Sequence, residues 1–303
     1  MKIELNTNIG LLELIGNTPL IDVSFLFSNS KTSLFAKAEW MNPGGSLKDR
    51  SVKNMLIEAI QSGKLSKDKI IIDSSSGNAA IAYSMIGNAL GYRVEIVIPG
   101  NASLERKQRI KAHGAILIET DPIEGYDEAL RCVHRLVDKE PNKYFFCDQY
   151  SNDNNWLAHY NNTAEEIIVQ MKNKFDYFIG GVGTGGSITG IGRKLKEIYP
   201  NIKVIGVRPE VWPGIEGLKP LGSPDDIVPK IFDESVIDDW IYITADESKE
   251  WCFKAAKKGL FIGQSSGSYL AACKKIEQII NKGKIVTLFN DFGDRYFSTG
   301  LWD

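Results

Sequence analysis

The stretch Tyr177-Phe178-Ile179-Gly180-Gly181-Val182-Gly183-Thr184-Gly185-Gly186-Ser187 is an apolar run that leads into a glycine-rich turn. Short apolar runs of this kind are typical of strands buried in parallel sheets. A helix-like stretch, residues 188–198, follows directly. Glycine lets the backbone close on a phosphate, which then binds the free N–H groups at the start of the helix. The stretch therefore predicts a strand, a phosphate-binding loop and a helix in an alpha/beta protein.

A second loop of the same kind, Ser74-Ser75-Ser76-Gly77-Asn78, lies between the apolar run 70–72 and the helix-like stretch 79–90. Its small polar residues offer backbone N–H groups and hydroxyls to an anion. Either loop alone is also compatible with simple tight-turn packing. Together the two loops predict a phosphorylated cofactor.

A lysine follows a third glycine-containing turn, Asn42-Pro43-Gly44-Gly45-Ser46-Leu47-Lys48-Asp49-Arg50. Ser46 is the expected N-cap, which puts Lys48 in the first turn of a helix. The positive end of the helix macrodipole favours a neutral amine there, and a neutral amine is the nucleophile that forms a Schiff base. The simpler alternative is a solvated surface lysine on a capped helix.

The glycine-rich loop leaves a rival interpretation open. Gly181, Gly183 and Gly186 match the G-x-G-x-x-G of dinucleotide-binding folds, and Glu210 lies about 20 residues further on, where an acid would bind the ribose. An NAD(P)-dependent oxidoreductase would leave Lys48 and the serine loop unexplained. A nucleotide-hydrolysing P-loop is disfavoured, because an acid follows Lys48 where Ser or Thr would bind magnesium.

Strand-like and helix-like segments alternate along the rest of the chain. Further apolar runs lie at residues 93–98, 115–118, 144–146, 204–207 and 285–288, and helix-like stretches at 103–112, 246–258 and 266–280. This alternation predicts mostly parallel sheets with right-handed crossovers and flanking helices. Two glycine loops favour two sheets with the cofactor between two lobes, since ligands bind at such clefts.

Composition excludes several classes of protein. The chain has 303 residues, of which 43% are hydrophobic, and 36 basic residues against 38 acidic ones give a net charge of −2. Nothing here is basic enough to predict nucleic-acid binding. The start, Met1-Lys2-Ile3-Glu4-Leu5, has no long apolar run, so we expect neither a signal peptide nor a membrane segment. The cytoplasm is the expected compartment.

Cysteines and histidines give no sign of a disulfide framework or a metal site. They lie far apart and show no C-x-x-C or ligand spacing: Cys132, Cys147, Cys252, Cys273, His113, His134 and His159. His159 follows Gln149 closely enough to approach a pocket, but a structural role is expected.

The ordered motifs resemble the cysteine synthase (O-acetylserine sulfhydrylase) family of fold-type-II pyridoxal-phosphate enzymes, and the resemblance covers nearly the whole chain. It is carried by Ile15-Gly16-Asn17-Thr18-Pro19-Leu20, Asn42 to Arg50, Ser76-Gly77-Asn78, Asp148-Gln149-Tyr150, Gly183 to Ser187, Ser265-Ser266-Gly267 and Gly293-Asp294-Arg295-Tyr296. It implies a two-lobed architecture like that of the tryptophan synthase beta subunit. Residues 39–149 would form the smaller lobe, and residues 1–38 with 150–303 the larger. A homodimer is expected.

The resemblance also implies a role for each matching residue. Lys48 would form the Schiff base with pyridoxal 5'-phosphate, Asn78 would bind the phenolic oxygen, and Ser265 would face the pyridine nitrogen. The phosphate would lie on Gly183, Thr184, Gly185, Gly186 and Ser187. The substrate would be bound by Ser75, Ser76, Gly77, Ala79 and Gln149.

The implied reaction is beta-replacement. An O-activated L-serine, either O-acetylserine or O-phosphoserine, would lose its leaving group to give an aminoacrylate, and sulfide or another sulfur donor would add to it and give L-cysteine. An amine nucleophile, as in siderophore-precursor synthases, is the alternative within the family. A non-catalytic relative on this fold would be expected to lack Lys48 or Asn78, and both are present.

Three departures from the family pattern bear on the substrate. Ser75 and Ala79 replace the two threonines of the usual Thr-Ser-Gly-Asn-Thr loop, and Thr163-Ala164-Glu165-Glu166 replaces Thr-Gly-Pro-Glu. The short segment 208–229 resembles that of the B-type enzymes. Lys219 lies where relatives that use O-phosphoserine place an arginine, so we expect it to recognise the leaving group.

Overall fold

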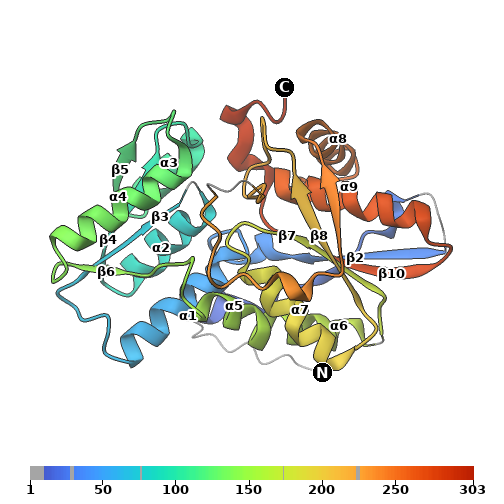
Figure 1. Ribbon diagram of the computed structural model, residues 1–303, viewed down its shortest axis with the longest axis horizontal. Coiled ribbons are helices and arrows are strands. Elements are labelled where there is room, and N and C mark those ends of the chain that lie inside the picture. The colour runs from blue at the N-terminus through green and yellow to red at the C-terminus, as the bar shows by residue number, and fades with distance from the viewer. Residues whose placement is uncertain (1–9, 28–30, 76, 173, 223–225) are drawn as a thin grey trace, which may run out of the picture.

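The structure, a computed structural model, describes residues 10–27, 31–75, 77–172, 174–222 and 226–303. Ser76, one of the expected substrate-binding residues, lies outside the described residues. Two sheets lie side by side, each flanked by helices (Figure 1). The alpha/beta fold with mostly parallel sheets is therefore confirmed.

The larger sheet has six strands. Their order is β1 (Leu20–Asp22), β2 (Thr32–Ala38), β10 (Gly283–Phe289), β7 (Tyr177–Gly181), β8 (Lys203–Pro209) and β9 (Asp239–Ile243). β1 runs antiparallel to β2, and the other pairings between these described strands are parallel. The smaller sheet is parallel throughout its described strands, in the order β5 (Ile116–Thr120), β4 (Arg93–Pro99), β3 (Ile70–Ser74) and β6 (Tyr144–Phe146).

Helices cover the sheets and follow the glycine-containing loops. The bounds are α1 (Lys48–Gln61), α2 (Asn78–Ala89), α3 (Leu104–Ala112), α4 (Gly125–Lys139), α5 (Asn154–Ala158), α6 (Ala164–Met171), α7 (Gly186–Ile198), α8 (Ala245–Ala256) and α9 (Gln264–Ile279). Shorter helical segments lie at η1 (Leu11–Leu14), η2 (Ser24–Leu26), η3 (Glu39–Met41), η4 (His159–Thr163), η5 (Glu234–Val236) and η6 (Gly293–Thr299). The turn η4 is π-helical and separates α5 from α6.

The strands and helices expected from apolar runs are all present within a few residues of their predicted bounds. No such bound shifts by more than two residues; α7, for example, begins at Gly186 and so includes the end of the glycine loop. Three strands, β1, β2 and β9, were not predicted. β2 is the most important of them, because it pairs with both β1 and β10 inside the six-stranded sheet.

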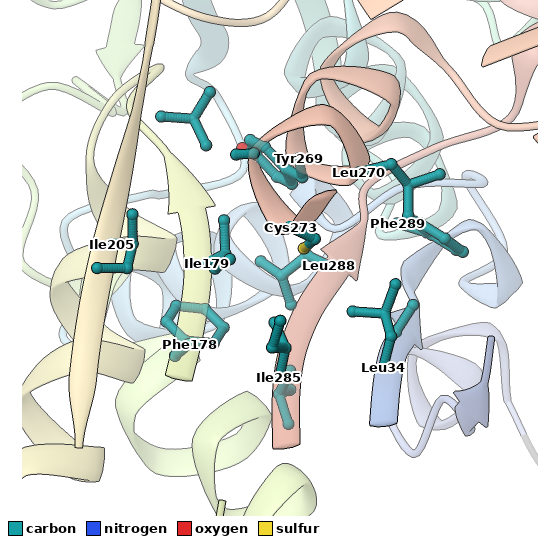
Figure 2. Close-up of a cluster of buried hydrophobic side chains, with 14 of the residues drawn as sticks. Leu34, Phe178, Ile179, Ile205, Tyr269, Leu270, Cys273, Ile285, Leu288 and Phe289 are labelled. Carbon is teal, nitrogen blue, oxygen red and sulfur yellow. The ribbon is translucent and has the colours of Figure 1, made fainter. Parts of the chain in front are cut away.

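A continuous apolar core fixes the strand ends that carry the loops. Figure 2 shows Tyr269, Leu270 and Cys273 of α9 packed among side chains of β7 and β10. Phe178 and Ile285 are fully buried in this layer. Each such side chain contributes about 1.5–3 kcal/mol when it leaves water, so the end of β7 is held firmly.

A buried ion network ties α1 to the six-stranded sheet. Arg50 of α1 donates from Nε to Glu39 Oε2 at 2.6 Å and from Nη1 to Glu166 Oε1 at 2.7 Å. Lys37 of β2 donates from Nζ to Glu166 Oε2 at 2.6 Å. Burial acts to raise the pKa of Glu166, but the bonds from Arg50 and Lys37 outweigh it and hold the pKa at about 2.

We expect Glu166→Gln to destabilise the protein by about 3 kcal/mol at pH 7, because two buried cations lose their shared carboxylate. The depressed pKa of Glu166 means that its contribution is present above its ordinary pKa of 4.5 and is lost as the pH falls towards 2. Urea unfolding at pH 7, 5 and 3 measures this. Wild type should lose more stability than the variant over this range, and parallel losses in the two proteins would contradict the assignment.

Candidate active site

A cavity of about 540 Å³ lies where loops from both sheets meet, a size suited to a cofactor or substrate. Predicted site residues that line it are Lys48, Ser75, Gly77, Asn78, Ala79, Gln149, Gly183, Thr184 and Lys219. Gly185, Gly186 and Ser187 continue from Thr184 into α7, and Ser265 lies behind Gly217 in the wall. The fold thus brings together all of the predicted site residues that the structure describes.

Lys48 is the first residue of α1, as expected for a lysine in the first helical turn. The residue directly before α1 is Leu47, not Ser46; its backbone angles are already helical, and its side chain makes no capping hydrogen bond. Ser46 Oγ nevertheless accepts the Lys48 N–H at 3.3 Å. Desolvation lowers the pKa of the Lys48 amine to about 8. Near neutral pH about a tenth of this amine is therefore neutral and nucleophilic, against roughly one in 2,500 for an unperturbed lysine.

The glycine-rich loop forms a close-packed cradle at the start of α7. Gly185 has a left-handed φ of +82°, which favours glycine. A Cβ on Gly183 would lie 2.7 Å from the carbonyl oxygen of Gly217, so a side chain there would push the two loops apart. Thr184 Oγ1 accepts from Asn155 Nδ2 at 3.1 Å, which leaves the threonine hydroxyl proton free to be donated. The cradle and the helix start suit a phosphate.

Asn78, the first residue of α2, is oriented by the C-terminal segment. Its Nδ2 donates to Asp291 Oδ2 at 2.7 Å, and its Oδ1 accepts from Arg295. Arg295 in turn donates from Nη2 to the Gly44 carbonyl at 2.5 Å, in the turn before Lys48. An amide nitrogen carries two hydrogens, so Asn78 can also donate to a ligand.

Ser265 lies in the first turn of α9 and is buried. Its Oγ accepts from Asn290 Nδ2 at 2.9 Å. A hydroxyl that accepts one hydrogen bond can still donate its own proton. Ser265 is therefore able to donate to a ring nitrogen.

The serine loop is connected to Gln149. Ser75 Oγ accepts the Gly77 N–H at 3.1 Å, and Gln149 Nε2 donates to the Ser74 carbonyl at 2.7 Å. Asn155 Nδ2 donates to the Gln149 carbonyl at 2.7 Å and thus links this loop to Thr184 of the glycine cradle. These groups form a neutral, hydrogen-bonding wall.

Lys219 lines the same cavity, but its amine is engaged. Nζ donates to Asp127 Oδ1 at 3.1 Å and to the Ile227 carbonyl at 2.8 Å. Glu210, the acid that a dinucleotide site would require, accepts the Ala245 N–H at the start of α8. Its carboxylate is thus used to cap a helix.

Sequence reasoning assigned no role to several residues of this site. Arg106 and Glu216 line the cavity and form an ion pair, and Asp291 and Arg295 hold Asn78. One signal was available, because Arg106 is followed four residues later by the buried Ile110, which places both on the inner face of α3.

The histidine and cysteine residues considered in the sequence analysis do not form a catalytic or metal-binding group among the residues described. His159 is buried, Nδ1 lies 3.0 Å from Thr163 Oγ1, and desolvation lowers the pKa of His159 to about 3. All four cysteines are free thiols. Within the described ranges, no group of three His, Cys, Asp or Glu side chains is placed to hold a metal, and no helix is long and apolar enough to cross a membrane.

We expect Lys48 to be unusually reactive in the ligand-free protein. At pH 8 about half of an amine with a pKa of about 8 is neutral, against roughly one in 250 for an unperturbed lysine. Acetic anhydride labelling between pH 7 and 10, followed by peptide mass spectrometry, measures the rate, with exposed Lys64 as the reference for reagent activity. The Lys48 rate should level off above pH 9. A rate still rising steeply at pH 10 would refute the lowered pKa.

Comparison with known proteins identifies the family to which the chain belongs. Residues 11–291 match the model of the pyridoxal-phosphate dependent enzymes. The chain is 45% identical to a cysteine synthase of Aquifex aeolicus over 96% of this chain and 91% of that protein. It is 32% identical to cysteine synthase B of Salmonella typhimurium, over 96% and 95% of the two chains.

A solved structure agrees with the sequence matches. Cysteine synthase (OASS) from Entamoeba histolytica superposes with a TM-score of 0.91 at 33% identity, covering 100% of this chain and 93% of that one. The cavity, with its desolvated lysine and glycine cradle, is thus found in a chain that belongs to the pyridoxal-phosphate dependent enzymes of the cysteine synthase family.

Proposed function

We propose that the protein catalyses beta-replacement on an O-activated L-serine with sulfide to give L-cysteine. The observation that supports this most directly is the desolvated amine of Lys48, in one cavity with a glycine cradle and a serine loop. O-Acetylserine and O-phosphoserine are the candidate substrates.

The residues of the cavity fit pyridoxal 5'-phosphate. The cradle at Gly183 and Gly185 tolerates no side chain, and the start of α7 offers N–H groups to the phosphate. When bound, the cofactor withdraws electrons from the substrate and so acidifies the proton on its alpha carbon. We assign the phosphate to residues 183–187, the phenolic oxygen to Asn78 and the pyridine nitrogen to Ser265.

Lys48 has two tasks in this proposal. Its neutral amine would hold the cofactor through the aldehyde, and the same amine, once free, would take the proton from the alpha carbon of the bound substrate. A base with a pKa of about 8 suits proton transfer near neutral pH. Asn78 is held by Asp291, so the ring it binds is oriented relative to Lys48.

Ser265 tunes the electronics of the reaction. A serine hydroxyl does not keep a pyridine nitrogen protonated as a carboxylate would, so electron withdrawal is moderate. Moderate withdrawal favours prompt loss of the leaving group from the beta carbon. Sulfide would take the place of the leaving group on this carbon, and the protonated amine of Lys48 would return a proton to the alpha carbon before the product leaves.

The serine loop and Gln149 would bind the substrate. Ser75, Gly77, Ala79 and Gln149 line the cavity, and their neutral hydrogen-bonding groups suit the substrate carboxylate. We also assign leaving-group recognition to Lys219, which would have to exchange its bond to Asp127 for one to the substrate.

The division into lobes, the oligomeric state and the cellular compartment are also proposals. We propose residues 39–149 as one lobe and residues 1–38 with 150–303 as the other, which close on the substrate. We further propose a homodimer in the cytoplasm that acts on small molecules.

Lys48→Ala tests the proposed function. The purified wild-type protein should absorb visible light, and the variant should lose this band and at least about a thousandfold in the rate of cysteine formation from O-acetylserine and sulfide. Lys53→Ala, five residues on in α1, is the matched control and should keep both. Activity in Lys48→Ala, or activity that depends on a nicotinamide, would reject the proposal.

Lys219→Ala tests the leaving group. If Lys219 meets the phosphoryl group, kcat/KM should fall about tenfold or more for O-phosphoserine and less for O-acetylserine, because a charged hydrogen bond to phosphate is lost. Steady-state assays with each substrate measure the two values. Unchanged kinetics with both substrates would remove Lys219 from the site.

A further inference from the structure

Arg106 is a buried cation in the cavity wall to which the proposed function gives no task. It lies in the first turn of α3, where its N–H donates to the N-cap Ser103 Oγ at 3.4 Å. Only 3% of its side chain is exposed. A buried charge is costly unless other groups compensate it, so the contacts of Arg106 need an explanation.

The side chain of Arg106 touches three separate segments. Nη1 donates to Glu216 Oε2 at 2.7 Å, and the guanidinium carbon lies 4.6 Å from the centre of the Tyr296 ring. A Cβ added to Gly77 would lie 2.8 Å from Arg106 Nε, so the arginine occupies the space beside the serine loop. Nε itself is buried without a hydrogen-bond partner among the residues described.

Glu216 belongs to residues 211–220, which follow β8 and line the cavity; we name them the rim segment. On its own side the rim segment is fastened to the six-stranded sheet, because Lys219 N–H donates to the Val182 carbonyl at 2.7 Å and Glu216 N–H donates to Gln264 Oε1 at 3.0 Å. Across the cavity it is joined by the ion pair from Glu216 to Arg106. A second ion pair joins Lys219 to Asp127 of α4. The rim segment therefore bridges the two sheets.

We propose that Arg106 is a positioning residue that couples the serine loop to the rim segment through Glu216. Arg106 fills the space beside Gly77, so a movement of the serine loop displaces the guanidinium, and the ion pair passes the movement to Glu216. The loop that receives the substrate and the segment that borders the opening then close together. The kinetic part of this inference rests on the proposed function.

A matched pair of variants isolates the coupling. Glu216→Gln breaks the ion pair between Glu216 and Arg106. Glu119→Gln breaks the ion pair between Glu119 and Lys107, the next residue of α3. The N–O distance is 2.7 Å in both pairs. The two glutamates are similarly exposed, 39% and 43%, but Glu119 lies in β5 of the same small sheet and away from the cavity.

Hydrogen exchange on the unliganded protein is the first measurement. Glu216→Gln should raise exchange by about tenfold in peptides of the rim segment and also in peptides covering residues 73–80, because both lose one anchor. Glu119→Gln should change neither. Unchanged exchange at residues 73–80 in Glu216→Gln would overturn the proposal.

The kinetics of the holoenzyme are the second measurement. Glu216→Gln and Arg106→Gln should each speed dissociation of L-cysteine about tenfold and raise KM, while the single-turnover rate of alpha-proton loss changes less than about twofold. Arg106→Lys keeps a cation beside Glu216 and should restore much of the wild-type dissociation rate. Equal losses in the chemical step and in binding would overturn the positioning role.

The two measurements separate this inference from the proposed function. Hydrogen exchange needs no turnover, so coupled exchange supports the bridge even if neither O-acetylserine nor O-phosphoserine reacts. If Arg106→Gln does not fold, Glu216→Gln carries the test, because Glu216 is partly exposed and its replacement leaves no large cavity.

Discussion

The arrangement of the site depends on the ion network around Arg50. Lys48 and Arg50 are two residues apart at the start of α1, so they project from different faces of the helix. Arg50 is bound to Glu39 and Glu166, both held by the larger sheet and its helices. Rotation of α1 would leave buried charges unpaired, at a cost of several kcal/mol. The network therefore keeps the Lys48 amine in the cavity, where desolvation makes it a nucleophile.

Charge balance around the cavity helps to explain why the Lys48 amine loses its proton more readily than an ordinary lysine. Desolvation is the cause of the lowered pKa of Lys48. The other cavity cations, Arg106 and Lys219, are each compensated by a carboxylate of the opposite side, Glu216 and Asp127. Backbone N–H groups and helix starts at this cavity can attract an anion without titrating, so they do not compete with the amine for protons. The glycines of both loops thus have two effects: they allow the tight backbone turns, and they expose uncharged N–H groups to the cavity.

The local sequence pattern was sufficient to predict an element or site that is formed by residues close together in the chain. β7, the glycine loop and α7 are continuous in the chain, and the sequence predicted them together with Lys48. β2 was missed because Lys37 stands inside it, and a lysine near the end of a short apolar run looks solvent-exposed. Lys37 is buried because distant groups accept from its amine, above all the carboxylate of Glu166, 129 residues away, with the Thr18 carbonyl and the Gln170 side chain. The ion pair between Arg106 and Glu216 could not be predicted either, because its two residues are 110 positions apart in the chain.

The ion pairs of Arg50 with Glu39 and of Arg106 with Glu216 differ in how exposed their carboxylates are. Glu39 is fully buried against Arg50, so breaking that pair would leave a buried carboxylate with neutral hydrogen-bond donors in place of its bonded counter-ion. Glu216 is 39% exposed and regains water when it leaves Arg106, so the cost of opening this pair falls mainly on the buried guanidinium. One cluster is therefore permanent and fixes the amine, while the other can open and reform. A cavity that must hold its nucleophile still and yet exchange substrate for product requires both kinds of ion pair, and α1 and α3 supply one each.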